Sequence, residues 1–273
     1  TQQRTVHMGH TASYYYVGKN PALAFDTGVP FGLSARQHNA WMYHGGGLEL
    51  TRGLFADFNI INFPGGNTGT QMGGWFRRPV DTAADLRGLK MRIPAVGGRV
   101  MSRLGVNVQL ISGGEIYSAL ERGAIDATEW VGPYDDEKLG LNKIADYYYY
   151  PGWWEPSAGL SFYVNRDAWN DLPESYQEIL TSAAGEANLL MLAAYDAKNP
   201  AAYQRLLDGG TDIRPFSRDI LEAAERETRA YLDENAAADE SYATILQSYR
   251  EFGEASRKWF ATAERAYSEY TVG

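Results

Sequence analysis

Residues 86–131 carry the sequence feature that most constrains the fold. The segments GLKMRIPA, VNVQLI and AIDATEW read as strands, and the segments between them, GGRVMSRLG and EIYSALERG, read as short helices that end at glycine. Strands that alternate with helices through such short connections pair in parallel and have right-handed crossovers. The sequence therefore predicts an α/β fold that contains a parallel sheet.

The ends of these strands are where a ligand is expected. In open parallel sheets, ligands bind beyond the carboxyl ends of the strands, where helix N-termini point inward. Arg92 lies near such an end, and so do Glu129 and Trp130. An arginine in a strand more often faces solvent and pairs with a neighbour, but a strand covered by helices on both sides has little solvated face. We therefore expect Arg92 to bind a carboxylate through its planar guanidinium.

A second glutamate beside tryptophan, Glu155 in the segment YYYYPGWWEPS, extends this group. Two surface or salt-bridged glutamates are the alternative interpretation of Glu129 and Glu155. If both line one cleft together with a ligand carboxylate, protonation or a cation must offset their repulsion. With the amide oxygen of Gln71, the ligand set consists of oxygen atoms, which suits Na⁺ or Ca²⁺ rather than zinc.

The composition narrows the classes of function. The chain has 273 residues, enough for two modest domains, and a net charge of −9 without a cluster of Lys or Arg, so nucleic acid is not an expected partner. It has no cysteine, which excludes a disulfide and a thiolate site. The four histidines lack the spacing of a zinc site, and the glycine-rich segments do not match a nucleotide-binding motif.

A long helix is expected at the carboxyl terminus. Aromatic and apolar residues recur at three- and four-residue steps between positions 242 and 270, among them Tyr249, Trp259 and Tyr267. Such a stripe usually packs into a core. Because the stripe is longer than one small domain usually covers, packing across domains or against a second subunit is the alternative.

The order of these motifs resembles one family of transport proteins. The run GLKMRIPAVGGRVMSRLGVNVQLISGGEIYSALERGAIDATEWVGPYDD, followed by YYYYPGWWE, resembles the extracytoplasmic solute-binding proteins of TRAP transporters. Within this DctP-type family, the branch that binds 2-oxo acids is the most similar, and the similarity extends through essentially the whole chain. Members normally have further strand and helix units before the segment that resembles TVHMGHTASYYYVGK, so we expect this chain to lack the family's amino-terminal segment.

The resemblance implies a two-lobed, periplasmic-binding-protein-like α/β fold, with strands that cross between the lobes and long carboxy-terminal helices. We expect the first lobe to comprise residues 1–88 and 158–200, and the second lobe to comprise residues 89–157 and 201–273. Members of the family close on a carboxylate and pass it to a sodium-coupled membrane permease. The resemblance therefore implies a periplasmic binding protein without enzymatic activity.

Individual residues also acquire roles through the resemblance. Arg92 matches the arginine that anchors the substrate carboxylate. Gln71, Glu129 and Trp130 also belong to the implied substrate-binding site. Gln71, Glu129, the backbone carbonyl of Trp130 and Glu155 match the positions that hold a cation, and the ligand's carboxylate and 2-oxo oxygens then complete its coordination. The implied cation is Na⁺, with Ca²⁺ as the alternative. The implied ligand is a small 2-oxo monocarboxylate such as pyruvate, and a longer homologue or a 2-hydroxy acid stays open.

Two other functions agree with part of the sequence. In a glycosidase, Glu129 and Glu155 would be the acid and the base, with a sugar stacked on Trp153 or Trp154, but Arg92 would have no role. A sugar-binding protein of an ABC importer would have the same fold, but it would bind neutral ligands without a cation.

Overall fold

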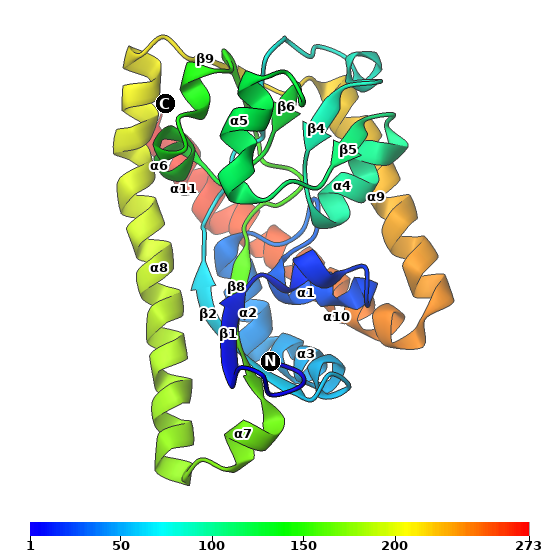
Figure 1. Ribbon diagram of the computed structural model, residues 1–273, viewed down its shortest axis with the longest axis vertical. Coiled ribbons are helices and arrows are strands. Elements are labelled where there is room, and N and C mark those ends of the chain that lie inside the picture. The colour runs from blue at the N-terminus through cyan, green and yellow to red at the C-terminus, as the bar shows by residue number, and fades with distance from the viewer. Residues whose placement is uncertain (273) are drawn as a thin grey trace.

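The computed structural model describes residues 1–272, which form two lobes around two separate sheets. In Figure 1 the larger sheet lies above the smaller one, and the long helix α8 (Glu174–Asp208) runs beside both. The α/β fold with two lobes that the sequence predicts is therefore confirmed. Within the described residues, no helix combines the length and the apolar character that crossing a membrane requires.

The smaller sheet forms the centre of the first lobe. Its antiparallel strands lie in the order β1 (Met8–Thr11), β8 (Gly159–Asn165), β2 (Ile60–Asn67). Around it are α8 and several shorter helices, namely η1 (Ser13–Tyr16), η2 (Pro21–Leu23), α1 (Ala24–Thr27), α2 (Ala35–His44), α3 (Gly47–Ala56) and α7 (Arg166–Asn170). Helices α3 and α8 both pack against β2, so this strand is covered over much of its length.

The larger sheet has six strands and forms the second lobe. Their order is β5 (Asn107–Gln109), β4 (Lys90–Arg92), β6 (Ala127–Thr128), β3 (Gly74–Phe76), β7 (Tyr147–Tyr150), β9 (Asp212–Pro215). The helices of this lobe include η3 (Ala83–Leu86), α4 (Ala95–Arg103), η4 (Gly113–Glu115), α5 (Ile116–Glu121), α6 (Pro133–Lys138) and η5 (Leu141–Lys143). Strand β4 pairs in parallel with β5 and with β6, as the strand and helix alternation predicts. Strand β3 is antiparallel to both of its neighbours.

The chain passes between the lobes at segments that also carry the candidate site. The first crossing follows β2, which ends at Asn67, and the return crossing joins β7 to β8. We propose the first crossing as the lobe boundary instead of residue 88, because β3 already belongs to the larger sheet. Gly28 packs tightly on the return crossing, since a Cβ at this position would lie 2.8 Å from the carbonyl oxygen of Ser157.

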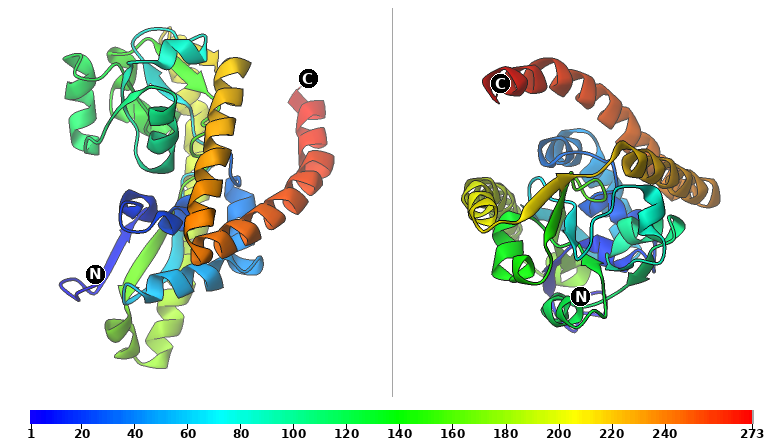
Figure 2. Two further views of the ribbon diagram at one scale, coloured as in Figure 1. Left: turned by 90° about the vertical axis from the view of Figure 1, so that its right-hand side faces the viewer. Right: turned by 90° about the horizontal axis from the view of Figure 1, so that it is seen from above.

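The carboxy-terminal helices cover both lobes and then leave them. Helix α9 (Arg218–Ala238) packs on α4 of the second lobe, whereas α10 (Glu240–Phe260) packs on α2 and α3 of the first lobe. We therefore propose to group α10 with the first lobe, although residues 201–273 were expected in the second. A π-helical turn (Ala261–Arg265) and α11 (Ala266–Val272) follow, and Figure 2 shows α11 standing away from the body of the protein.

The aromatic stripe of the carboxy-terminal helices, from α10 to α11, consequently has two environments. Tyr242, Ile245 and Tyr249 are buried in the main core, as expected of a core stripe. Trp259 and Tyr267 are 66% and 69% exposed. The expectation that the stripe packs into the core therefore holds only for its first half.

Candidate functional site

Arg92 is the positively charged side chain of the site, and the fold buries it. It is the last residue of β4, and only 4% of its surface is exposed, because neighbouring strands and helices cover β4. Its Nε donates a hydrogen bond to the carbonyl of Ile111 (3.2 Å), and Nη1 donates to the carbonyl of Glu129 (3.3 Å). The ring centre of Trp130 lies 5.3 Å from the guanidinium carbon. The solvent-facing interpretation of Arg92 is therefore wrong.

Glu129 supplies the carboxylate that pairs with Arg92. It follows β6 directly, is 2% exposed, and forms an ion pair with Nη1 of Arg92. Burial raises the pKa of the Glu129 carboxyl to about 7, and Arg92 lowers it less than burial raises it. Buried Asp136 adds a further upward shift to this pKa. A positive charge in addition to Arg92 would therefore stabilise the ionised form of Glu129.

Gln71 and Glu155 form the second half of the site. Both lie on the crossing segments, and they are 3% and 4% exposed. Gln71 Nε2 donates to Thr68 Oγ1 (3.0 Å), but within residues 1–272 Oε1 of Gln71 and Oε1 of Glu155 are buried without a hydrogen-bond partner. Burial raises the pKa of Glu155 well above its ordinary value, and the charge of Glu129 raises it further. Buried acceptor oxygens that receive no hydrogen bond are suitable ligands for a cation.

The two glutamates line one small cavity between the lobes. Its other walls come from the first lobe, from the start of α4 and from the return crossing: Tyr14, Gly28, Ile93, Pro94, Ala95, Val96, Gly97, Trp154. The free space is about 10 Å³, which is the room that one water molecule or ion needs.

The structure thus brings together the side chains of the predicted site residues Gln71, Arg92, Glu129 and Glu155, and it places the Trp130 ring beside Arg92. The described residues contain no cluster of three or more His, Cys, Asp or Glu side chains, so a cation here would depend on amide and carbonyl oxygens as well.

Sequence reasoning missed Tyr14. This residue lies in η1 of the first lobe, and its side chain nevertheless lines the cavity with Glu129 and Glu155. The only local signal was the run of three tyrosines at 14–16, which has no spacing that distinguishes a binding residue from a packed one.

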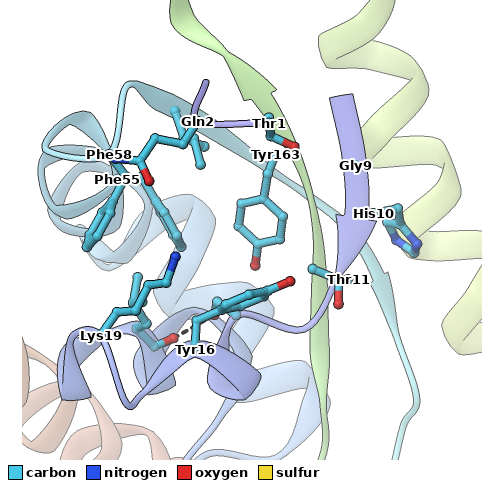
Figure 3. Close-up of a pocket in the computed structure, with 13 residues that line it drawn as sticks. Thr1, Gln2, Gly9, His10, Thr11, Tyr16, Lys19, Phe55, Phe58 and Tyr163 are labelled. Atoms are coloured by element: carbon cyan, nitrogen blue, oxygen red, sulfur yellow. Dashed lines mark hydrogen bonds between the residues drawn. The ribbon is translucent and has the colours of Figure 1, made fainter. Parts of the chain in front are cut away.

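A larger cavity of about 380 Å³ lies in the first lobe, near the start of the chain. Figure 3 shows Tyr16, Lys19 and Tyr163 around it, beside β1 and β8. None of the predicted site residues lines this cavity. We therefore assign the candidate site to the smaller, interlobe cavity.

The fold and the buried site define a two-lobed solute-binding protein. A model of the family described as bacterial extracellular solute-binding protein, family 7 (DctP), matches residues 1–239. The chain belongs to this family, whose members are solute-binding receptors of TRAP transporters and not enzymes.

One curated relative is a monocarboxylate 2-oxoacid-binding periplasmic protein of Nostoc. The two chains are 56% identical over 269 residues, which is 98% of this chain and 74% of the relative. The high identity over nearly the whole chain confirms the similarity to the 2-oxo acid branch.

Three solved structures of TRAP solute-binding proteins have nearly the same fold. The protein of Bordetella bronchiseptica is 47% identical with a TM-score of 0.97, and its structure contains calcium and picolinate. The alignment covers 99% of this chain and 81% of the Bordetella chain. The protein of Colwellia psychrerythraea is 42% identical (TM-score 0.96) and binds calcium and pyruvate. The protein of Pseudoalteromonas atlantica is 43% identical (TM-score 0.95) and binds sodium and pyruvate. Both of these cover 98% of this chain, and the chain covers 82% of each of them.

Proposed function

We propose that this protein is the periplasmic substrate-binding subunit of a TRAP importer and captures a small 2-oxo monocarboxylate such as pyruvate. The observation that supports this proposal is the buried group of Arg92, Glu129, Gln71 and Glu155. Two of its acceptor oxygens have no hydrogen-bond donor among residues 1–272. The lobes then close on the ligand, and the membrane permease recognises the closed form.

The proposed division of roles follows from charge. Arg92 binds the ligand carboxylate, and Gln71, Glu129, the carbonyl of Trp130 and Glu155 hold a cation. Two glutamates and the ligand bring three negative charges into a buried site. Arg92 with Na⁺ offsets two of them, and Arg92 with Ca²⁺ offsets all three, so either ion removes most of the repulsion.

Na⁺ is our first choice of cation, and Ca²⁺ is the alternative. The related structures with pyruvate contain sodium in one case and calcium in another. Because oxygen ligands suit both ions, the donor set of this chain agrees with both.

Equilibrium binding tests the proposal. Trp130 and Trp154 lie beside the site, so their fluorescence reports a ligand there. We expect pyruvate to bind in the presence of Na⁺ or Ca²⁺ and to lose at least about tenfold in affinity in sodium-free, chelated buffer. Pyruvate that binds equally well in both buffers would exclude the cation, and no binding in either would exclude the 2-oxo acid.

We further propose that a second copy of the chain covers the exposed end of the carboxy-terminal helix. Trp259 and Tyr267 are largely exposed there, and Figure 2 shows α11 standing away from the body of the protein. The related Bordetella bronchiseptica structure is described as a dimer. Burial of these aromatic side chains in a homodimer would remove them from water.

A further inference from the structure

A short turn of the first lobe reaches into the site of the second lobe. This turn, η1, follows β1 and packs against α1 of its own lobe and against α4 of the other lobe. Its residue Tyr14 is half-buried and lines the interlobe cavity with Glu129 and Glu155. The first lobe thus contributes a phenol hydroxyl to a cavity whose carboxylates come from outside that lobe.

Two adjacent tyrosines of this turn, Tyr14 and Tyr15, lie near the charged group. The hydroxyl oxygens of Tyr14 and Tyr15 are 3.5 Å apart. Burial raises the pKa of the Glu155 carboxyl, and the nearby Tyr14 hydroxyl acts in the opposite direction. Burial lowers the pKa of Arg92, but Glu129 and then the two tyrosines raise it more. Tyr14 therefore lies beside Glu155 in the cavity wall, and the Tyr15 hydroxyl lies next to that of Tyr14.

The buried core of the first lobe fixes this turn. Ser13 Oγ donates to the carbonyl of Leu23 (2.5 Å) and lies 3.2 Å from Oγ1 of Thr27. The backbone N–H of Tyr14 donates to the same Thr27 oxygen (3.4 Å). Ser13 and Thr27 are buried, so these first-lobe contacts hold the Tyr14 backbone, and the packing of η1 on α4 adds a contact from the second lobe. The turn therefore presents the Tyr14 side chain to the cavity on a fixed backbone.

We propose that Tyr14 is the closing contact of the first lobe: its hydroxyl donates a hydrogen bond to Glu155 when the lobes are shut and holds them together over the bound ligand. This inference rests on the proposed function. A hydrogen bond to a buried carboxylate, made only in the closed form, slows opening and release, whereas the encounter with the ligand in the open form does not use it.

Tyr14→Phe removes the hydroxyl and keeps the ring. Tyr16→Phe is the matched control, because Tyr16 belongs to the same turn but lines the other cavity, which Figure 3 shows. Stopped-flow tryptophan fluorescence with pyruvate and Na⁺ or Ca²⁺ gives both rate constants. For Tyr14→Phe we expect dissociation about tenfold faster or more, with association within about twofold of the unchanged protein. For Tyr16→Phe we expect neither constant to change.

The outcomes separate this inference from the proposed function. If the unchanged protein binds pyruvate and Tyr14→Phe releases it at the same rate, the closing contact is wrong and the proposed function stands. Equal acceleration by Tyr14→Phe and Tyr16→Phe, with a lower thermal midpoint in both, would show a general loosening of the turn and would also overturn the inference. If the unchanged protein binds no 2-oxo acid, the proposed function fails, and the inference fails with it.

Discussion

Arg92 and Glu129 form an ion pair in which the two side chains are only 5% and 3% exposed. Taking both charges out of water is costly, and their attraction repays this cost only when further hydrogen bonds complete the site. Here the carbonyl groups of Ile111 and Glu129 supply them for Arg92. Arg92 therefore stabilises the site and, in our proposal, also binds the ligand.

Replacement of Arg92 by alanine should affect both binding and stability. Without its counter-charge the ligand carboxylate would be buried unpaired, so pyruvate binding should be lost. Glu129 would also be left unpaired, and unfolding should require about 3–5 kcal/mol less free energy.

Calorimetric titration and denaturant unfolding measure these two effects. Arg205→Ala is the control, because Arg205 pairs with Glu137 at an exposed site, and it should cost less than about 1 kcal/mol. Pyruvate binding by Arg92→Ala with unchanged affinity would exclude Arg92 as the anchor.

Glu155→Gln should weaken the binding of the cation without breaking an ion pair. It removes one negative charge while keeping the shape and one acceptor oxygen, so we expect the affinity for Na⁺ or Ca²⁺ to fall about tenfold or more. Titration of the ion at a fixed pyruvate concentration measures this. Glu254→Gln, at an exposed surface pair with Lys258, should leave the titration unchanged. If Glu155→Gln also leaves it unchanged, Glu155 is not a ligand.

The stability of the cation-free protein should fall as the pH rises from 6.5 to 8. Burial raises the pKa of Glu129 from 4.5 to about 7, so the folded protein holds a proton that the unfolded chain has already released. Stability gained from that proton is present at low pH and is lost as the pH rises through 7. The loss from Glu129 alone is about 1 kcal/mol over this interval.

Thermal unfolding in sodium-free, chelated buffer checks this pH dependence. Burial also raises the pKa of Asp136, to about 6, which acts in the same direction below this interval. His38, whose pKa burial lowers from 6.5 to about 4, acts in the opposite direction, and it offsets part of the loss in the lower half of this interval, where the unfolded chain still binds a proton at this residue. Addition of Na⁺ or Ca²⁺ should make the thermal midpoint less dependent on pH. A midpoint that rises with pH in the cation-free buffer would contradict the account.

The proposed homodimer predicts a dependence on Trp259. Trp259→Ser changes an exposed side chain of α10 that contributes nothing to the main core, so the fold should be kept. We expect the unchanged protein to have the mass of a dimer by light scattering and the variant to shift toward a monomer. A monomeric mass for the unchanged protein would exclude the dimer.

Local sequence patterns were sufficient for the parallel part of the larger sheet. Strand β4, helix α4, strand β5 and strand β6 follow directly from alternating apolar residues and glycine stops, and their carboxyl ends place Arg92 and Glu129 together. Residue type alone singled out Glu155 beside its tryptophans and Gln71 as a possible oxygen ligand. Only the resemblance to a family placed both in one site, because neither lies in a periodic segment.

Features that depend on distant contacts could not be predicted in the same way. Strand β3 has three residues, and its membership in the larger sheet depends on pairing with β6 and β7. The exposure of Trp259 depends on where α10 leaves the first lobe, since the stripe in the sequence extends beyond that point to Tyr267. The place of Tyr14 in the site depends on how the lobes face each other, and no local pattern records that.

A crystal structure grown with pyruvate and Na⁺ or Ca²⁺ tests the central claim most directly. The account predicts an ion bound by oxygen atoms of Gln71, Glu129, Trp130 and Glu155, with the pyruvate carboxylate on the Arg92 guanidinium. Pyruvate bound in the first-lobe cavity beside Lys19, or in the interlobe site with no ion next to Glu155, would contradict it.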